Sequence, residues 1–189
     1  MWQNIVAGWS IAWSPDGRMI AFSDEGGIHT LNLDDFKVRK VVDRLAVGDP
    51  SSEPPKQPSW SPDGGYLAFV ATGGSFCIPA GDCYDSPRIF IASLNSPGIT
   101  NPVIDSLLRI DFDPAWSPNG KKIAFSSVRR CAWDYTETNS DIYIMNLDGT
   151  EVTRLTKWSF HEGQPVWSPD GKKSLSPDGA METIARAFM

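Results

Sequence analysis

The feature that most constrains the fold is a short phrase that the chain repeats. Trp-Ser-Pro-Asp-Gly occurs at residues 13–17, 60–64 and 167–171, and Trp-Ser-Pro-Asn-Gly occurs at residues 116–120. Successive copies begin 47, 56 and 51 residues apart. Self-similarity at about 40–50 residues is typical of propeller blades and of other repeat architectures. The repeat therefore predicts a fold built from several similar units.

Each copy has the chemistry of a β-hairpin. Pro presets φ for a type I turn, Asp or Asn bonds nearby backbone amides, and Gly takes the left-handed conformation that closes a bulged hairpin. An alternating strand follows, as in residues 123–125. A second hairpin runs from residues 142–147 through Asp148 and Gly149 to residues 152–155. Four short strands per repeat, apolar on both faces, predict a propeller blade.

The longest stretch of the pattern lies in residues 114–155, where Pro-x-Trp-Ser-Pro-Asn-Gly is followed by Ile-Ala-Phe, Asp-Ile-Tyr and Asp-Gly. It resembles the WD40-like PD40 repeat of TolB-type β-propellers, and the resemblance covers most of residues 11–173. The resemblance implies an all-β propeller of four-stranded antiparallel blades. Propellers of this type serve as protein-binding scaffolds, as substrate-gating domains of prolyl-oligopeptidase-like peptidases and, in a few cases, as lyases.

The repeat divides one unit, residues 1–189, into about three and a half blades. The expected blades are residues 11–45, 59–108 and 114–156, with a partial blade at 165–189.

Two inserts are expected within these blades, at residues 72–86 and 128–140. In the partial blade, a second Ser-Pro-Asp-Gly at 176–179 replaces the usual strand. The tail after it is expected to form either a shifted strand over 183–186 or a short helix.

An arc of this size would expose apolar blade faces and strand edges. Three interpretations remain open: an incomplete propeller with blades missing, a ring closed by association into a homo-oligomer, or a small distorted ring.

The composition of the chain limits which classes of partner are expected. The net charge is −6, and no Lys or Arg run alternates with aromatic residues, so a nucleic-acid partner is not expected. No transmembrane segment is predicted, because no apolar stretch is long enough to span a bilayer. The first ten residues lack the basic and apolar regions of a signal peptide. The family resemblance nevertheless favours a periplasmic or other extracytoplasmic location.

The sequence predicts no catalytic residues, metal site or cofactor. It has neither the G-x-S-x-G phrase of a serine hydrolase nor a phosphate-binding P-loop. Its two histidines are too few for the His-rich metal centre of lyase-like propellers. His29 aligns with the aromatic residues Phe90 and Tyr143 of other repeats, so it is expected to pack in the core.

The repeated residues have structural interpretations. The acids and the amide of the turns are expected to form those turns rather than a carboxylate array: Asp16, Asp63, Asn119 and Asp170. The repeated tryptophans are expected to wedge between blades rather than to stack on sugars: Trp13, Trp60, Trp116 and Trp167.

The blades of a propeller together form a disc. The topology of a blade places the Ser-Pro-Asp-Gly turns on one face of this disc, and the inserts and inter-blade links on the other. Aromatic and acidic residues on long loops above a rigid scaffold favour a recognition surface. The candidate ligand-binding residues are Asp111, Asp113, Trp133, Asp134, Tyr135, His161 and Glu162.

We therefore expect a non-catalytic scaffold that binds a protein or peptide. The alternatives are the gating propeller of a serine peptidase whose catalytic domain is absent from this chain, and a carbohydrate-active propeller.

The three cysteines indicate whether the protein's cellular compartment is oxidising or reducing. Cys77 and Cys83 bracket a Pro- and Gly-containing bend, so they are expected either to form a disulfide or to remain free thiols in a reducing compartment. Cys131 lies in the other insert and would stay unpaired. Cysteines in both inserts favour an oxidising compartment.

Overall fold

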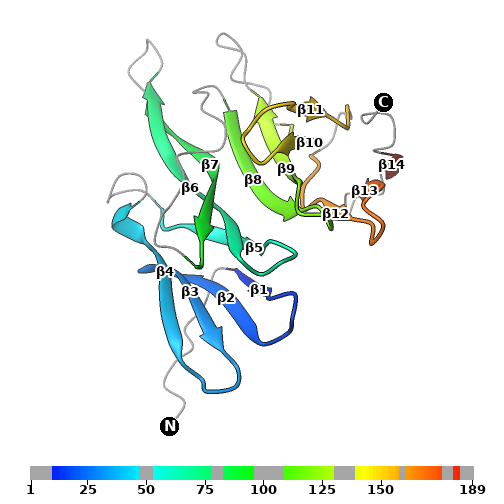
Figure 1. Cartoon of the computed structure of the whole chain (residues 1–189). Coiled ribbons are helices and arrows are strands. Elements are labelled where there is room, and N and C mark those ends of the chain that lie inside the picture. Colours follow the sequence, from blue (N-terminus) through cyan, green and yellow to red (C-terminus); the bar gives the residue numbers. More distant parts are fainter. Residues whose placement is uncertain are drawn as a thin grey trace.

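The computed structural model describes residues 10–46, 53–77, 83–95, 109–129, 139–157, 161–175 and 181–183. In these ranges the chain forms antiparallel β-sheets that follow one another along the sequence and curve into an arc (Figure 1). The one helical element there is a 3-10 turn, η1 (Arg44–Ala46). None of the described residues belongs to a helix with the length and hydrophobicity needed to cross a membrane.

Two sheets have the four strands expected of a complete blade, each strand pairing with the next. The first contains β1 (Ile11–Trp13), β2 (Met19–Asp24), β3 (Gly27–Asn32) and β4 (Val38–Asp43). The third contains β8 (Arg109–Trp116), β9 (Lys122–Arg129), β10 (Asp141–Asn146) and β11 (Thr153–Arg154). The predicted all-β class and four-stranded antiparallel blade are confirmed.

Three strands are described in each of the other two sheets. The second contains β5 (Lys56–Trp60), β6 (Tyr66–Cys77) and β7 (Cys83–Ser93). The fourth contains β12 (Val166–Trp167), β13 (Lys173–Leu175) and β14 (Met181–Thr183). The described part of the tail forms a strand at residues 181–183, which pairs with β13, whereas residues 184–189 of the expected strand or helix lie outside the described residues. The repeated Ser-Pro-Asp-Gly at 176–179 thus connects two paired strands.

The expected insert at 72–86 is largely strand. Strands β6 and β7 continue to pair past a bulge between Thr72 and Ser75, as far as Cys77 opposite Cys83. The two strands therefore project beyond the rest of their sheet, as Figure 1 shows. Sequence reasoning missed this extension because Gly73 and Gly74, which stand at the bulge, are typical of loops.

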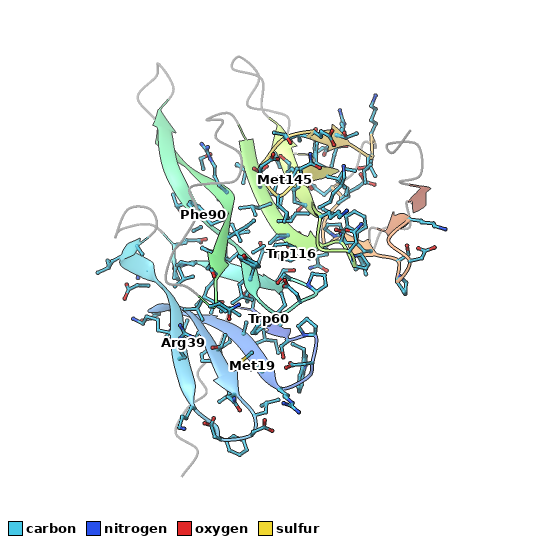
Figure 2. All side chains as sticks on the ribbon, viewed as in Figure 1. Met19, Arg39, Trp60, Phe90, Trp116 and Met145 are labelled. Carbon is cyan, nitrogen blue, oxygen red and sulfur yellow. The ribbon has the colours of Figure 1, made fainter. Side chains whose placement is uncertain are left out.

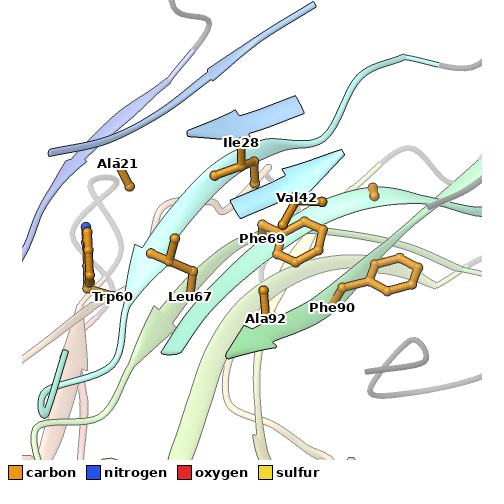
Figure 3. Close-up of a cluster of buried hydrophobic side chains, with 9 residues drawn as sticks. Ala21, Ile28, Val42, Trp60, Leu67, Phe69, Phe90 and Ala92 are labelled. Carbon is orange, nitrogen blue, oxygen red and sulfur yellow. The ribbon is translucent and has the colours of Figure 1, made fainter. Parts of the chain in front are cut away.

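The core lies between successive sheets. Alternate residues of β6 face opposite neighbours: Leu67 and Phe69 pack in a cluster with Ile28 and Val42 of the first sheet, whereas Ala68 packs with residues of the third. Figure 3 shows the first of these clusters. Because both faces of such a strand are buried, almost every residue along it is apolar, and the sequence shows no polar alternation.

The repeated tryptophans join the sheets at their first strands. The indole Nε1 donates to a backbone carbonyl of the preceding sheet in three copies: Trp60 to Ala12 at 3.1 Å, Trp116 to Ser59 at 3.1 Å and Trp167 to Ala115 at 2.9 Å. The acceptor is always the residue before the tryptophan of the preceding repeat. In Figure 2, Trp60 lies at the boundary between the first two sheets. The predicted wedge position therefore holds for these copies.

Trp13 differs from the other copies. Its side chain is 61% exposed, although the repeat predicts a buried wedge. The reason is its position in β1, at the end of the arc, where no described sheet lies against it (Figure 1).

Candidate binding face

The ends of the strands define two faces of the arc. In the third sheet, Trp116 pairs with Ile123 next to the Ser-Pro-Asn-Gly turn, and Arg109 pairs with Arg129 at the opposite end. We call the side with the four repeated turns the turn face. The insert face is the opposite side, defined by residues 109–113, 139–141 and 161–164. This division is the one that the topology of the repeat predicts.

Asp113 makes hydrogen bonds through both of its carboxylate oxygens. Its Oδ1 accepts a hydrogen bond from Gln57 Nε2 at 2.6 Å. Its Oδ2 accepts from Ser126 Oγ and from the backbone N–H of Gln164, both at 3.0 Å. In return, Gln57 Oε1 accepts the backbone N–H of Asp113 at 3.0 Å. One carboxylate thus links three consecutive sheets.

These contacts belong to a series that sequence reasoning missed. In the first three repeats, the residue three positions before the tryptophan uses its side chain to accept the backbone N–H of its counterpart in the next repeat. We call this series the polar ladder; its members are Ser10, Gln57, Asp113 and Gln164.

Three of the four ladder residues also share a backbone conformation. Gln57, Asp113 and Gln164 have φ values of 56°, 52° and 50°. Such left-handed values are uncommon outside glycine. For Gln57 and Asp113 the reason is visible in the strand pairing, which shifts register around each of them. The bulge turns the N–H of each residue toward the preceding sheet.

Asp111 and Glu162 are buried. Both Asp111 and Asp113, expected on a linker, lie instead in β8. Ser127 Oγ donates to Asp111 Oδ1 at 2.6 Å. Glu162 is held through its backbone, because its N–H donates to Ser140 O at 2.9 Å and its carbonyl accepts Ser140 Oγ at 2.6 Å. The neighbouring His161 is exposed.

The segment 161–164 is therefore fixed at two points, to the start of β10 through Ser140 and to β8 through Asp113. The structure brings together four of the predicted site residues, from two successive blades: Asp111, Asp113, His161 and Glu162. The other three, Trp133, Asp134 and Tyr135, lie outside the described residues. Across the described ranges, no cluster of three or more His, Cys, Asp or Glu side chains is arranged to hold a metal ion.

On the turn face the aspartates stabilise their own turns. A serine hydroxyl and the backbone N–H two residues later both donate to Oδ1 of Asp16, Asp63 and Asp170. The serine hydrogen bond, and then the backbone one, hold the pKa of each carboxyl below its ordinary value. Asn119 makes the same two contacts without a charge. These residues are turn formers, as their positions predict.

A shallow cavity of about 490 Å³ lies on the turn face between the second and third sheets. Tyr66 and Trp116 line it, with ring centroids 6.5 Å apart, and Pro62, Pro118 and Leu147 complete its apolar walls. One position in the repeat could have indicated it, because Tyr66 stands where the other repeats have Met19 or lysine.

His29 has the packing role expected of it. Its ring stacks on Phe22 with centroids 5.3 Å apart, and its Nε2 lies 3.0 Å from Asp24 Oδ1.

Sheets stacked face to face in an arc, with their first strands joined on the inside, define a β-propeller. The chain belongs to the PD40 family, the TolB β-propeller domain, whose model matches residues 49–176.

Three relatives illustrate the similarity. The chain is 41% identical over 69 residues to the Tol-Pal system protein TolB of Alcanivorax borkumensis, covering 35% of this chain and 14% of that protein. It is 35% identical over 83 residues to dipeptidyl-peptidase 5 of Porphyromonas gingivalis, covering 41% of this chain and 12% of the peptidase. The crystal structure of TolB from Acinetobacter baumannii superposes with a TM-score of 0.62 at 21% identity, covering 93% of this chain and 41% of that one.

The matches to these two curated relatives thus span less than a sixth of their lengths.

Proposed function

We propose that this chain is a non-catalytic binding scaffold that recognises a protein or peptide through its insert face. The observation that carries the proposal is the double attachment of segment 161–164, to Ser140 at 2.6 Å and to Asp113 at 3.0 Å. Through it, the segment that leads into β12 is tied to the blade before it, next to residues 139–141. A segment held in this way is well suited to binding because little ordering is needed when a partner arrives.

The candidate residues divide into two roles. Asp111, Asp113 and Glu162 are buried or hydrogen-bonded to neighbouring strands, and they hold this part of the face in place. His161 is exposed on segment 161–164. We propose that His161, together with Trp133, Asp134 and Tyr135 of the insert, contacts the partner. Aromatic residues are the usual anchors of such contacts, because they bury much area with few rotatable bonds.

Two further observations support a scaffold. The relative from A. borkumensis is named as a protein of the Tol-Pal system. The repeated turn carboxylates accept hydrogen bonds from their own turns, which assigns them to structure rather than to chemistry.

The second candidate function is that of a gating propeller in a serine peptidase. The similarity to dipeptidyl-peptidase 5 favours it. In that case the neighbour of the propeller would be a catalytic domain of the same polypeptide, and the disc would limit which substrates reach it.

The test uses the full chain as bait for a random peptide library displayed on phage, followed by calorimetry with the selected peptides. Replacing Trp133 and Tyr135 together by Ala should weaken binding about thirtyfold or more, as loss of an anchor does. The matched control is Asp148→Ala, in the β10–β11 turn on the opposite face, which should leave affinity unchanged. Equal losses from both faces, or a loss that follows unfolding in circular dichroism, would contradict the proposal.

A further inference from the structure

The cavity on the turn face has no part in the function proposed above, because it lies on the side opposite the insert face. Its volume of about 490 Å³ is within the size range of pockets that bind small ligands or single side chains with their neighbours. Tyr66 is 44% exposed, so the ring that lines the cavity is accessible to a ligand. The cavity lies between the second and third sheets, within the described part of the chain.

The two aromatic rings of the cavity are held in place by hydrogen bonds. The Trp116 indole donates to Ser59 O at 3.1 Å. The backbone of Tyr66 is bound twice by Ser61, whose Oγ accepts the Tyr66 N–H and whose N–H donates to the Tyr66 carbonyl, both at 2.9 Å. The rings are inclined by 28°, with centroids 6.5 Å apart. A ligand therefore meets an aromatic wall that needs little ordering on binding.

Asp63 gives the cavity a negative charge. Its Oδ1 accepts hydrogen bonds from the Ser61 hydroxyl at 2.5 Å and from the Gly65 N–H at 3.0 Å. None of the described residues donates to its Oδ2. The described residues that line the cavity include no Lys or Arg that could neutralise the carboxylate. The cavity is therefore complementary to a cation, which aromatic rings also attract.

The combination of a turn carboxylate with an aromatic ring six positions after the tryptophan occurs in one repeat. The first repeat has Met19 where the second has Tyr66, and the third and fourth have lysine there. The third repeat also has Asn119 in place of the carboxylate, and its turn makes the same two hydrogen bonds. Neither the turn nor the contact between sheets therefore requires this pair of residues, which is what a ligand site predicts.

We propose that this cavity binds an arginine side chain of a polypeptide partner. The guanidinium group donates to Asp63 Oδ2, and its plane stacks on the exposed ring of Tyr66, next to Trp116. Arginine fits better than lysine because its guanidinium is planar, stacks on aromatic faces and is weakly hydrated. The methylene groups of the arginine contact the apolar walls at Pro62 and Pro118.

An NMR titration of the full chain with capped tripeptides tests the proposal. The peptides have the sequence Gly-X-Gly, in which X is arginine or citrulline. Citrulline keeps the shape of the arginine side chain and has no charge, so the comparison isolates the charge of the guanidinium. The arginine peptide should bind at least about tenfold more tightly than the citrulline peptide, because hydrogen bonds between two charged groups are the stronger ones.

Two variants remove the two recognition groups separately. Asp63→Asn should weaken binding of the arginine peptide about tenfold, and Tyr66→Met should weaken it about fivefold. Both should fold, as circular dichroism can verify, because Asn119 and Met19 occupy these positions in other repeats; if one does not fold, the other decides. Asp16→Asn is the matched control, since it makes the same change in a turn without the aromatic residue, and it should bind as the wild type does.

An arginine peptide that does not bind at millimolar concentration, or that binds no more tightly than the citrulline peptide, would overturn the proposal. So would wild-type affinity in Asp63→Asn, or an equal loss in Asp16→Asn. Replacing Trp133 and Tyr135 together by Ala should leave this binding unchanged, which separates the result from the test of the insert face. Loss of arginine binding in that double variant would overturn the assignment to the turn face.

Discussion

The indole nitrogen of Trp116 donates to the backbone carbonyl oxygen of Ser59, 3.1 Å away in the neighbouring blade. Ser59 precedes the tryptophan of its own repeat, and the same offset recurs at Ala12 and Ala115. The repeated phrase therefore specifies two things at once. Its Ser-Pro-Asp-Gly part forms a turn within a blade, and its tryptophan sets how that blade sits on the previous one.

Asp113→Asn should destabilise the fold by about 1–3 kcal/mol. Both carboxylate oxygens of Asp113 face donors, from Gln57, Ser126 and Gln164. The amide group of Asn would turn an NH₂ toward at least one of them. The backbone should not resist the change, because Asn tolerates the φ of 52° found there. Urea unfolding measures the effect.

The control for Asp113→Asn is Asp34→Asn, which makes the same chemical change at an exposed site. Its effect should stay within about 0.5 kcal/mol. Equal unfolding midpoints for the two variants would show that the polar ladder contributes no stability.

Asn119→Asp should make stability more dependent on pH. In the equivalent turn, the Ser61 hydroxyl and the Gly65 N–H lower the pKa of Asp63 from its ordinary value of 3.8. A carboxyl with a lowered folded pKa stabilises the fold above its unfolded pKa, and this contribution is lost as pH falls through the folded pKa. The variant should therefore gain stability over the wild type at neutral pH and lose that gain in acid.

The measurement is the thermal unfolding midpoint at neutral pH and below pH 3.8. The converse variant, Asp63→Asn, should lose stability at neutral pH and show a smaller change on acidification. A difference between Asn119→Asp and wild type that is the same at both pH values would argue against an ionised turn contact.

Cys77 and Cys83 should form an intramolecular disulfide under oxidising conditions. They lie directly opposite each other in the antiparallel pair β6–β7. Cα atoms at such positions are about 4.5–5.5 Å apart, which is within the range that disulfides span. Alkylation without reductant, followed by peptide mass spectrometry, should label Cys131 and leave these two cysteines unlabelled. Labelling of all three would rule out the disulfide.

Local chemistry made much of the fold predictable. The turn residues Asp63 and Asn119 bond only to neighbours within a few positions, so their roles follow from the phrase in which they stand. The strands after each turn follow from their apolar runs, because a strand that is covered on both sides needs no polar alternation.

The polar ladder and the exposure of Trp13 could not be predicted in the same way. The ladder position is occupied by Ser10, Gln57, Asp113 and Gln164, so no repeated letter marks it, and its hydrogen bonds join residues about 50 positions apart. The exposure of Trp13 depends on what lies beside its blade and not on its own repeat. Asp113 was predicted as a site residue from its place near the insert face, but its contacts depend on the register shift in β8.

The most direct test of the hydrogen bond from tryptophan to the preceding blade is a comparison of Trp→Phe variants. Their chemical unfolding is measured at a dilution where the chain is monomeric. Phe keeps the ring packing and removes only the indole donor. Trp60→Phe and Trp116→Phe should each lower the free energy of unfolding by about 1 kcal/mol, whereas Trp13→Phe, at the exposed edge, should leave it unchanged. Equal losses at all three positions, or no loss at Trp116, would contradict the account.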